Sequence, residues 1–217
     1  RSRSRSVVVT AAHCVYTPAR GLDTKLGTPG FATSVRFTPG SSREDNAPRE
    51  TWTAATMFID PRYRRDGDIT HDLAFLTMTP NQARRVQDVA GALAVRFSGD
   101  ERATPARDVT VLGYPAAAGF DGLTLRACHA AKATFGFFPG NYSMRCRMTG
   151  GTSGGPWMSD VATSAINSGP RAGEQVGDGT VVAVSSHTTT EGPATDVAVP
   201  LLASSRVLYD NADREQP

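Results

Sequence analysis

Residues 150–156 read Gly150-Gly151-Thr152-Ser153-Gly154-Gly155-Pro156, a serine with glycines on both sides. Glycine permits a tight backbone turn, and the N–H groups that such a turn exposes can stabilise a negatively charged oxygen. Gly154-Gly155-Pro156 cannot begin a stable helix, because glycine and proline are both poor helix residues. The stretch therefore predicts a nucleophilic serine on a turn that no helix follows.

Two further motifs supply the groups that such a serine needs. Thr10-Ala11-Ala12-His13-Cys14 lies near the start, and His71-Asp72-Leu73-Ala74-Phe75-Leu76 lies between the other two motifs. A serine hydroxyl is a poor nucleophile without a base, and an imidazole base needs a carboxylate to fix its tautomer. We expect Ser153 to be the nucleophile, His13 the base and Asp72 its partner, with the amides of Gly151 and Ser153 as oxyanion donors.

A rival interpretation fits the same letters. Gly151 to Gly155 satisfies G-x-S-x-G, the nucleophile elbow of α/β-hydrolases, and Ser153, Asp178 and His187 follow the chain order of that fold. The elbow requires a helix directly after the serine, which Gly154-Gly155-Pro156 disfavours. No βαβ pattern surrounds the motif, so we do not adopt this interpretation.

Short β-rich runs separated by Gly and Pro turns recur along the chain, which is typical of an antiparallel β protein with few helices. Only residues 82–94 look weakly helical, and Ala90-Gly91 interrupts them. The predicted strands are residues 7–9, 34–37, 52–58, 73–78, 109–112 and 181–184.

Together the three motifs resemble those of chymotrypsin/trypsin-like serine proteases, and more narrowly the secreted bacterial branch that includes the glutamyl endopeptidases. The resemblance implies an all-β fold of two six-stranded antiparallel Greek-key β-barrels. Residues 1–97 would form the first barrel with His13 and Asp72, residues 98–106 the linker, and residues 107–217 the second barrel with Ser153. It also implies a serine endopeptidase that acts on polypeptide substrates.

Composition gives no sign of another partner. The 23 basic and 21 acidic residues leave a net charge of only +2, so no nucleic acid is expected. No apolar run approaches the length of a membrane span. The four histidines and three cysteines show no metal-ligand spacing, so we expect no metal and no cofactor, although a structural calcium ion stays an open alternative. The chain is expected to be a monomer.

The resemblance also implies how the three cysteines are used. Similar secreted proteases have a disulfide before the serine, which implies that Cys128 pairs with Cys146 and that the protein is extracellular. Cys14 is left over. Such proteases also carry a strand and hairpin before the histidine motif, whereas few residues precede Thr10 here. We expect a first barrel truncated at its N-terminus, in which Cys14 is a free thiol.

The resemblance also places the substrate pocket. One side would be residues Arg147, Met148 and Thr149, and the other Ser185, Ser186 and His187. Ser186 matches the family serine that hydrogen-bonds the catalytic aspartate. Arg147 or His187 offers a donor for a carboxylate, which suggests a preference for acidic side chains. The pocket histidine of glutamate-specific members, however, falls at Ser185.

Two departures from the family pattern affect the expected function. Thr152 stands where proteases activated by cleavage have an aspartate that pairs with the new N-terminal amine, so we expect activity without that ion pair. The expected truncation of the first barrel raises an alternative, a catalytically inactive pseudoprotease that binds a partner. All three triad residues are present, which favours the active enzyme.

Overall fold

The first strand, β1 (Val7–Thr10), consists of four β-branched residues, which favour extended backbone. It pairs in antiparallel fashion with β6 (Ala74–Met78), and Thr10 lies opposite Ala74. All five residues of β6 are buried, so β6 lies in the core of the N-terminal part of the protein. β1 lies at one edge of its sheet, whose strand order is β1-β6-β5-β4.

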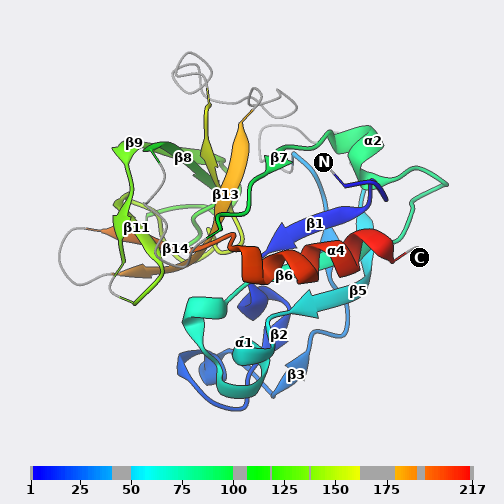
Figure 1. The fold of residues 1–217 in the computed structure, drawn as a ribbon, viewed down its shortest axis with the longest axis horizontal. Helices are drawn as coiled ribbons and strands as arrows, with labels where there is room; N and C mark the ends of the chain where they lie inside the picture. The colour runs from blue at the N-terminus through cyan, green and yellow to red at the C-terminus, as the bar shows by residue number, and fades with distance from the viewer. Residues whose placement is uncertain are drawn as a thin grey trace. The chain divides into compact units, whose positions relative to one another are not determined.

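The computed structural model describes residues 2–40, 50–99, 107–117, 119–136, 138–161, 179–189 and 194–215. The chain divides into two units, the first comprising Arg1–Pro39, Pro48–Ala92 and Ala203–Pro217, and the second Gly40–Ala47 and Leu93–Leu202 (Figure 1). Most of the predicted linker, residues 100–106, lies outside the described residues.

The first unit holds a four-stranded and a two-stranded sheet. Its buried core includes Trp52, Tyr63 and Leu76. Besides β1 and β6, its strands are β2 (Tyr16–Thr17), β3 (Gly30–Phe31), β4 (Arg36–Phe37) and β5 (Trp52–Ile59). Its helices and 3₁₀ turns are η1 (Ala12–Cys14), η2 (Leu22–Leu26), α1 (Pro61–Asp66), η3 (Ile69–His71), α2 (Val86–Ala90), η4 (Ala203–Ser205) and α4 (Arg206–Arg214).

The last helix, α4, belongs to this first unit, whereas the sequence placed all residues from 107 onward in a second barrel. It packs on β1, β5 and β6. Leu208 and Ala212 form its buried side, and Thr77 on β6 donates a hydrogen bond to the Ala212 carbonyl at 2.9 Å. The C-terminal helix belongs to the first unit because its apolar side is buried on the sheet of that unit.

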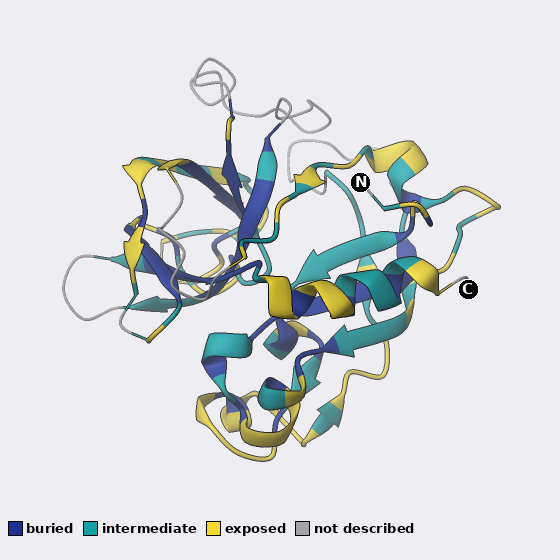
Figure 2. Cartoon of the chain, in the orientation of Figure 1, coloured by how far each residue is buried: buried dark blue, intermediate teal, exposed yellow. Residues whose placement is uncertain are grey.

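The second unit is built on one eight-stranded sheet around a core that includes Val111, Trp157 and Ala183. Figure 2 shows buried strands in both units, with exposed residues mostly at turns and on the outer side of helices. The strands are β7 (Ala94–Val95), β8 (Arg107–Gly113), β9 (Arg126–Lys132), β10 (Thr134–Phe135), β11 (Tyr142–Arg145), β12 (Pro156–Ser159), β13 (Thr180–Thr189) and β14 (Thr195–Pro200).

The predicted all-β class with few helices is confirmed. Among the described residues, the strands form a four-stranded, a two-stranded and an eight-stranded sheet. α2 ends at Ala90 with Gly91 as its C-cap, at the point where the sequence predicted an interruption. Within the described part of the chain, no helix has the length and apolar character needed to cross a membrane.

Candidate active site

His13 lies on η1, the short turn that directly follows β1. Ala11 and Ala12 are fully buried, and only small side chains fit such positions in a close-packed core. The turn is closed by hydrogen bonds from the Cys14 N–H to the Ala11 carbonyl at 3.2 Å and from the Val15 N–H to the Ala12 carbonyl at 3.0 Å. The two alanines therefore anchor the turn and leave the His13 side chain partly exposed.

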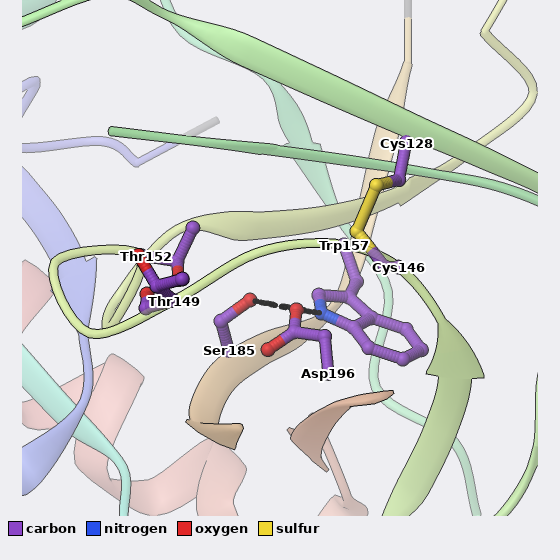
Figure 3. Close-up of a disulfide and its surroundings, with 7 residues drawn as sticks. All are labelled: Cys128, Cys146, Thr149, Thr152, Trp157, Ser185 and Asp196. Atoms are coloured by element: carbon purple, nitrogen blue, oxygen red, sulfur yellow. Dashed lines mark hydrogen bonds between the residues drawn. A yellow bond between two sulfur atoms is a disulfide. The ribbon is translucent and has the colours of Figure 1, made fainter. Parts of the chain in front are cut away.

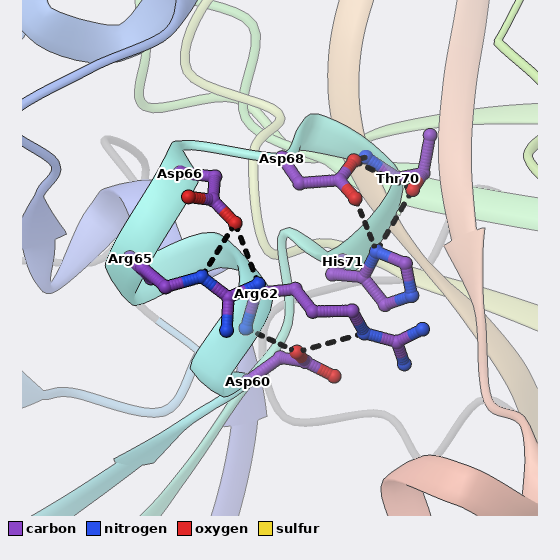
Figure 4. A network of polar contacts seen from close by, with 7 residues as sticks. All are labelled: Asp60, Arg62, Arg65, Asp66, Asp68, Thr70 and His71. Carbon is purple, nitrogen blue, oxygen red and sulfur yellow. Dashed lines mark hydrogen bonds and ion pairs between the residues drawn. The ribbon is translucent and has the colours of Figure 1, made fainter.

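Asp72 follows η3, a turn that other side chains hold in place (Figure 4). Asp68 caps this turn by accepting hydrogen bonds from the N–H and the hydroxyl of Thr70, at 3.0 and 2.7 Å. His71 Nδ1 lies 2.9 Å from Asp68 Oδ2 and 2.8 Å from the Thr70 hydroxyl. His71 therefore has a structural role in the turn that presents Asp72.

The register of β1 on β6 brings His13 and Asp72 together. Because Thr10 lies opposite Ala74 in an antiparallel pair, the residue after β1 and the residue before β6 meet at the same end. His13 Nδ1 lies 2.6 Å from Asp72 Oδ2, and the backbone N–H of His13 donates to Asp72 Oδ1 at 2.8 Å. When Nδ1 carries the proton that bonds to Asp72, Nε2 is the basic nitrogen of the neutral imidazole.

Burial lowers the pKa of His13, but the hydrogen bond and negative charge of Asp72, together with Cys14, outweigh it. The pKa of His13 is therefore raised above its ordinary value. Asp72 is fully buried, so its charge acts on the imidazole with little screening by solvent. Such a pair can act as a base whose protonated form is strongly stabilised.

Asp23 lies beside this pair, and the sequence analysis did not identify it. One nitrogen of His13 and carboxylate oxygens of Asp23 and Asp72 lie within 4.8 Å of one another, close enough to share a metal ion. The 2.6 Å contact between His13 Nδ1 and Asp72 Oδ2 is a direct hydrogen bond, which favours a shared proton over a shared cation. Sequence spacing gave no sign of this cluster.

Ser153 lies on the predicted turn, whose shape depends on Gly151. Gly151 has φ 104°, and a Cβ there would lie 2.6 Å from the Tyr114 carbonyl oxygen, so no other residue fits without strain. The loop after β8 holds the turn through a hydrogen bond from the Ala116 N–H to the Gly150 carbonyl at 2.7 Å. Thr152 is buried and donates its hydroxyl to the Thr149 carbonyl.

β13 holds the other part of the turn. The Gly154 N–H donates to the Ser185 carbonyl at 2.8 Å, and the Ser185 N–H donates to the Gly155 carbonyl at 2.9 Å. The Ser153 hydroxyl donates to the Ser186 carbonyl at 3.3 Å. None of the backbone hydrogen bonds found among the described residues uses the N–H of Gly151 or of Ser153, so both donors are available to a bound oxygen.

A buried polar network lies behind Ser185 (Figure 3). Its hydroxyl donates to Asp196 Oδ2 at 2.7 Å, and the Trp157 indole N–H donates to the same oxygen at 3.1 Å. Asp196 is fully buried, and its Oδ1 has no hydrogen-bond partner within the described residues. Burial raises the pKa of Asp196 to about 6 despite these hydrogen bonds. Sequence analysis had singled out neither Asp196 nor Trp157 as a partner of Ser185.

The residues predicted to line the substrate pocket fall into two groups. Arg147 and Met148 line a cavity of about 370 Å³ whose other lining residues are Gly119, Phe120, Arg126, Ala127 and Cys128. Thr149 accepts a hydrogen bond from the Ala117 N–H at 3.1 Å. Ser185, Ser186 and His187 lie on β13 and do not line this cavity, and Ser186 Oγ lies 2.5 Å from His187 Nδ1.

The predicted disulfide is confirmed, since Cys128 is bonded to Cys146. It links β9 to the residue after β11, next to the cavity. Cys14 is a free and exposed cysteine.

Residues 2–162 match the family model described as a trypsin-like peptidase domain. No curated protein sequence matches the chain. Among solved structures, the thermostable serine protease AL20 from an extremophilic microorganism is 25% identical with a TM-score of 0.78, covering 100% of this chain and 88% of its own.

Two further structures are similar. Protease Anisep from Arthrobacter nicotinovorans is 25% identical with a TM-score of 0.76, covering 99% of this chain and 86% of its own. A Glu endopeptidase is 13% identical with a TM-score of 0.70, covering 97% of this chain and 82% of its own. At 13% identity, the last similarity shows the fold alone.

Proposed function

The chain belongs to the trypsin-like peptidase family, and from that premise we propose that it is an active serine endopeptidase that hydrolyses peptide bonds through an acyl-enzyme. Ser153 is the nucleophile, His13 the general base and Asp72 the partner that orients the imidazole. The observation that carries the proposal is the 2.6 Å hydrogen bond between His13 Nδ1 and the fully buried Asp72, the arrangement that a histidine base requires.

In the first step, Ser153 Oγ attacks the substrate carbonyl carbon while His13 Nε2 takes its proton. The imidazolium then gives that proton to the leaving amine, which leaves an ester on Ser153. Water attacks this ester by the same route and restores the serine. Asp72 stays ionised throughout and stabilises the imidazolium.

The negative oxygen of the tetrahedral intermediate is bound by the N–H groups of Gly151 and Ser153. Neither N–H has a partner in the backbone hydrogen-bond network of the described residues, which supports this role because neither has to break such a bond to bind the oxygen. We expect activity without an ion pair between an acidic residue at position 152 and a free N-terminal amine. Thr152 supports this expectation, because its N–H and its hydroxyl both donate to the Thr149 carbonyl and so hold the turn before the serine.

The substrate pocket is proposed to include residues from both groups, Arg147, Met148 and Thr149 with Ser185, Ser186 and His187. Preference for an acidic side chain stays a prediction. Arg147 supports it, whereas the fully buried carboxylate of Asp196 behind Ser185 weighs against it. The test is a peptide library in which the residue before the scissile bond is varied through all amino acids. Equal cleavage after Glu, Asp and neutral residues would exclude a preference for acidic side chains.

We also propose that the protein is extracellular and monomeric and needs no cofactor. The Cys128–Cys146 disulfide supports an oxidising compartment.

The direct experiment is hydrolysis of a fluorescently labelled, denatured protein by the wild type, by Ser153→Ala and by Ser204→Ala. Ser204 is an exposed serine on η4 and serves as the matched control. We expect cleavage by the wild type and the control, and none by Ser153→Ala. Binding without cleavage by folded wild-type protein would overturn the proposal and indicate an inactive binding module.

A further inference from the structure

Asp23 is a buried carboxylate that the proposed mechanism does not use. It lies on η2 and is only 8% exposed. Its carboxylate, the carboxylate of Asp72 and a ring nitrogen of His13 lie within 4.8 Å of one another. The imidazole thus has two carboxylates beside it, where the proposed mechanism requires one.

The core of the first unit fixes the position of Asp23. Tyr63 on α1 is fully buried and donates its hydroxyl to Asp23 Oδ2 at 2.8 Å. Gly67 ends α1 in a left-handed conformation with φ 64°, and a Cβ there would lie 1.9 Å from the Arg20 carbonyl oxygen. The backbone that leads into η2 therefore packs directly against the end of α1, which brings Asp23 within reach of Tyr63.

Two nearby buried carboxylates repel each other unless positive or hydrogen-donating groups neutralise them. Here these groups include the ring proton and the backbone N–H of His13, which bond to Asp72, and the Tyr63 hydroxyl, which bonds to Asp23. The pKa of Tyr63 is strongly raised, by burial first and then by the charge of Asp72 and the hydrogen bond to Asp23. Among the described residues, the titratable groups near His13 include Asp72, Asp23 and the thiol of Cys14. Tyr63 lies next to them through its hydrogen bond to Asp23.

We propose that Asp23 is a positioning residue that acts on His13 through its charge. With Asp72 it stabilises the imidazolium form, and Tyr63 limits this effect by donating to Asp23. The consequence for turnover rests on the proposed function, because the imidazolium forms as Ser153 attacks. The effect on His13 itself does not depend on activity.

The size of the effect follows from the distance. A unit charge about 5 Å away in a partly buried site changes a pKa by roughly one unit after screening and relaxation. Asp23→Asn is therefore expected to lower the pKa of His13 by about one unit. Tyr63→Phe removes one hydrogen bond to Asp23, which leaves its charge less compensated, and is expected to raise the pKa of His13 by about half a unit.

The test is an NMR titration of the His13 imidazole in the wild type and in both variants. Asp66→Asn is the matched control, since it removes an exposed carboxylate from α1, and we expect a shift of less than about 0.2 units from it. Opposite shifts in Asp23→Asn and Tyr63→Phe support the proposal. A purely structural role would destabilise both variants without moving the pKa in opposite directions.

An unchanged pKa in Asp23→Asn overturns the proposal. If that variant does not fold, Tyr63→Phe decides alone, and a pKa that stays level or falls overturns it. The pH dependence of kcat/KM separates this inference from the proposed function, since its acidic limb is expected to move with the NMR value. If the NMR shifts occur in a chain without activity, the inference stands and the proposed function is rejected. If the chain is active but the shifts are absent, the proposed function stands and the inference is rejected.

Discussion

His13 and Ser153 are held in opposite ways. In the first unit, side chains hold the base: Asp72 bonds to both the imidazole and the backbone N–H of His13. In the second unit, backbone groups hold the nucleophile, because β13 bonds to Gly154 and Gly155 through main-chain atoms. We infer from this difference that side-chain charge sets the pKa of the base, whereas the backbone conformation positions the nucleophile.

The largest effect is expected from Asp72→Asn, which changes one side chain in the first unit. Asparagine favours the wrong tautomer of His13 and no longer stabilises its positive form, so kcat is expected to fall by about 10⁴. Steady-state kinetics checks this, with Asp66→Asn as the exposed control. A loss of less than tenfold would mean that side-chain charge does not govern the base.

Gly151→Ala tests whether backbone shape positions the nucleophile and the oxyanion donors. Its Cβ would lie 2.6 Å from the Tyr114 carbonyl oxygen at φ 104°, so the turn must move and the oxyanion donors with it. We expect kcat to fall by about 10², as for loss of one oxyanion donor. Gly150→Ala is the control, since a Cβ there meets nothing within 4 Å. Equal activity of the two variants contradicts the account.

Removing the disulfide with Cys128→Ala and Cys146→Ala tests how the second unit is stabilised. The bond closes a loop with a sequence separation of 18, so its loss is expected to lower the free energy of unfolding by roughly 3 kcal/mol. Denaturant unfolding measures this. Cys14→Ala removes the free cysteine and should leave stability unchanged within about 0.5 kcal/mol.

Asp196→Asn tests the buried carboxylate behind Ser185. The pKa of Asp196 is about 6 in the folded protein, against an ordinary aspartate value of 3.8, so the folded state binds the extra proton. Stability from this group is therefore present at low pH and lost as pH rises from about 4 to about 6. Relative to Asp196→Asn, the wild type is expected to lose about 2 kcal/mol across that window.

Denaturant unfolding at several pH values measures that difference. Asp108→Asn, an exposed carboxylate of the same unit, is the control and should follow the wild type. Parallel stability curves for the wild type and Asp196→Asn would show that Asp196 does not titrate in this window.

The sequence predicted the residues whose partners have a recognisable motif. His13 and Asp72 could be paired before the fold was known, because each stands in a distinctive short motif, and the resemblance implied the disulfide. The strands could be placed from their β-branched runs, such as Val7–Thr10. These features depend on residues close together in the chain or on a pattern specific enough to name.

Contacts between distant residues without a motif could not be predicted. Asp23 and Tyr63 are 40 positions apart, and neither stands in a recognisable pattern. Asp196 meets Ser185 only because β14 pairs with β13. The helix α4 did leave a signal, since Leu208 and Ala212 are spaced four residues apart on one helical side.

The most direct test of the joint role of His13 and Ser153 is covalent labelling of the purified chain with a fluorophosphonate, followed by peptide mapping. The variants are His13→Ala and, as the matched control, His71→Ala, which removes the histidine that bonds to Asp68 and Thr70 in the turn before Asp72. The account predicts stoichiometric labelling at Ser153 in the wild type and in His71→Ala, and a loss in folded His13→Ala. Equal labelling of His13→Ala and the wild type, or no labelling of folded wild-type protein, would contradict it.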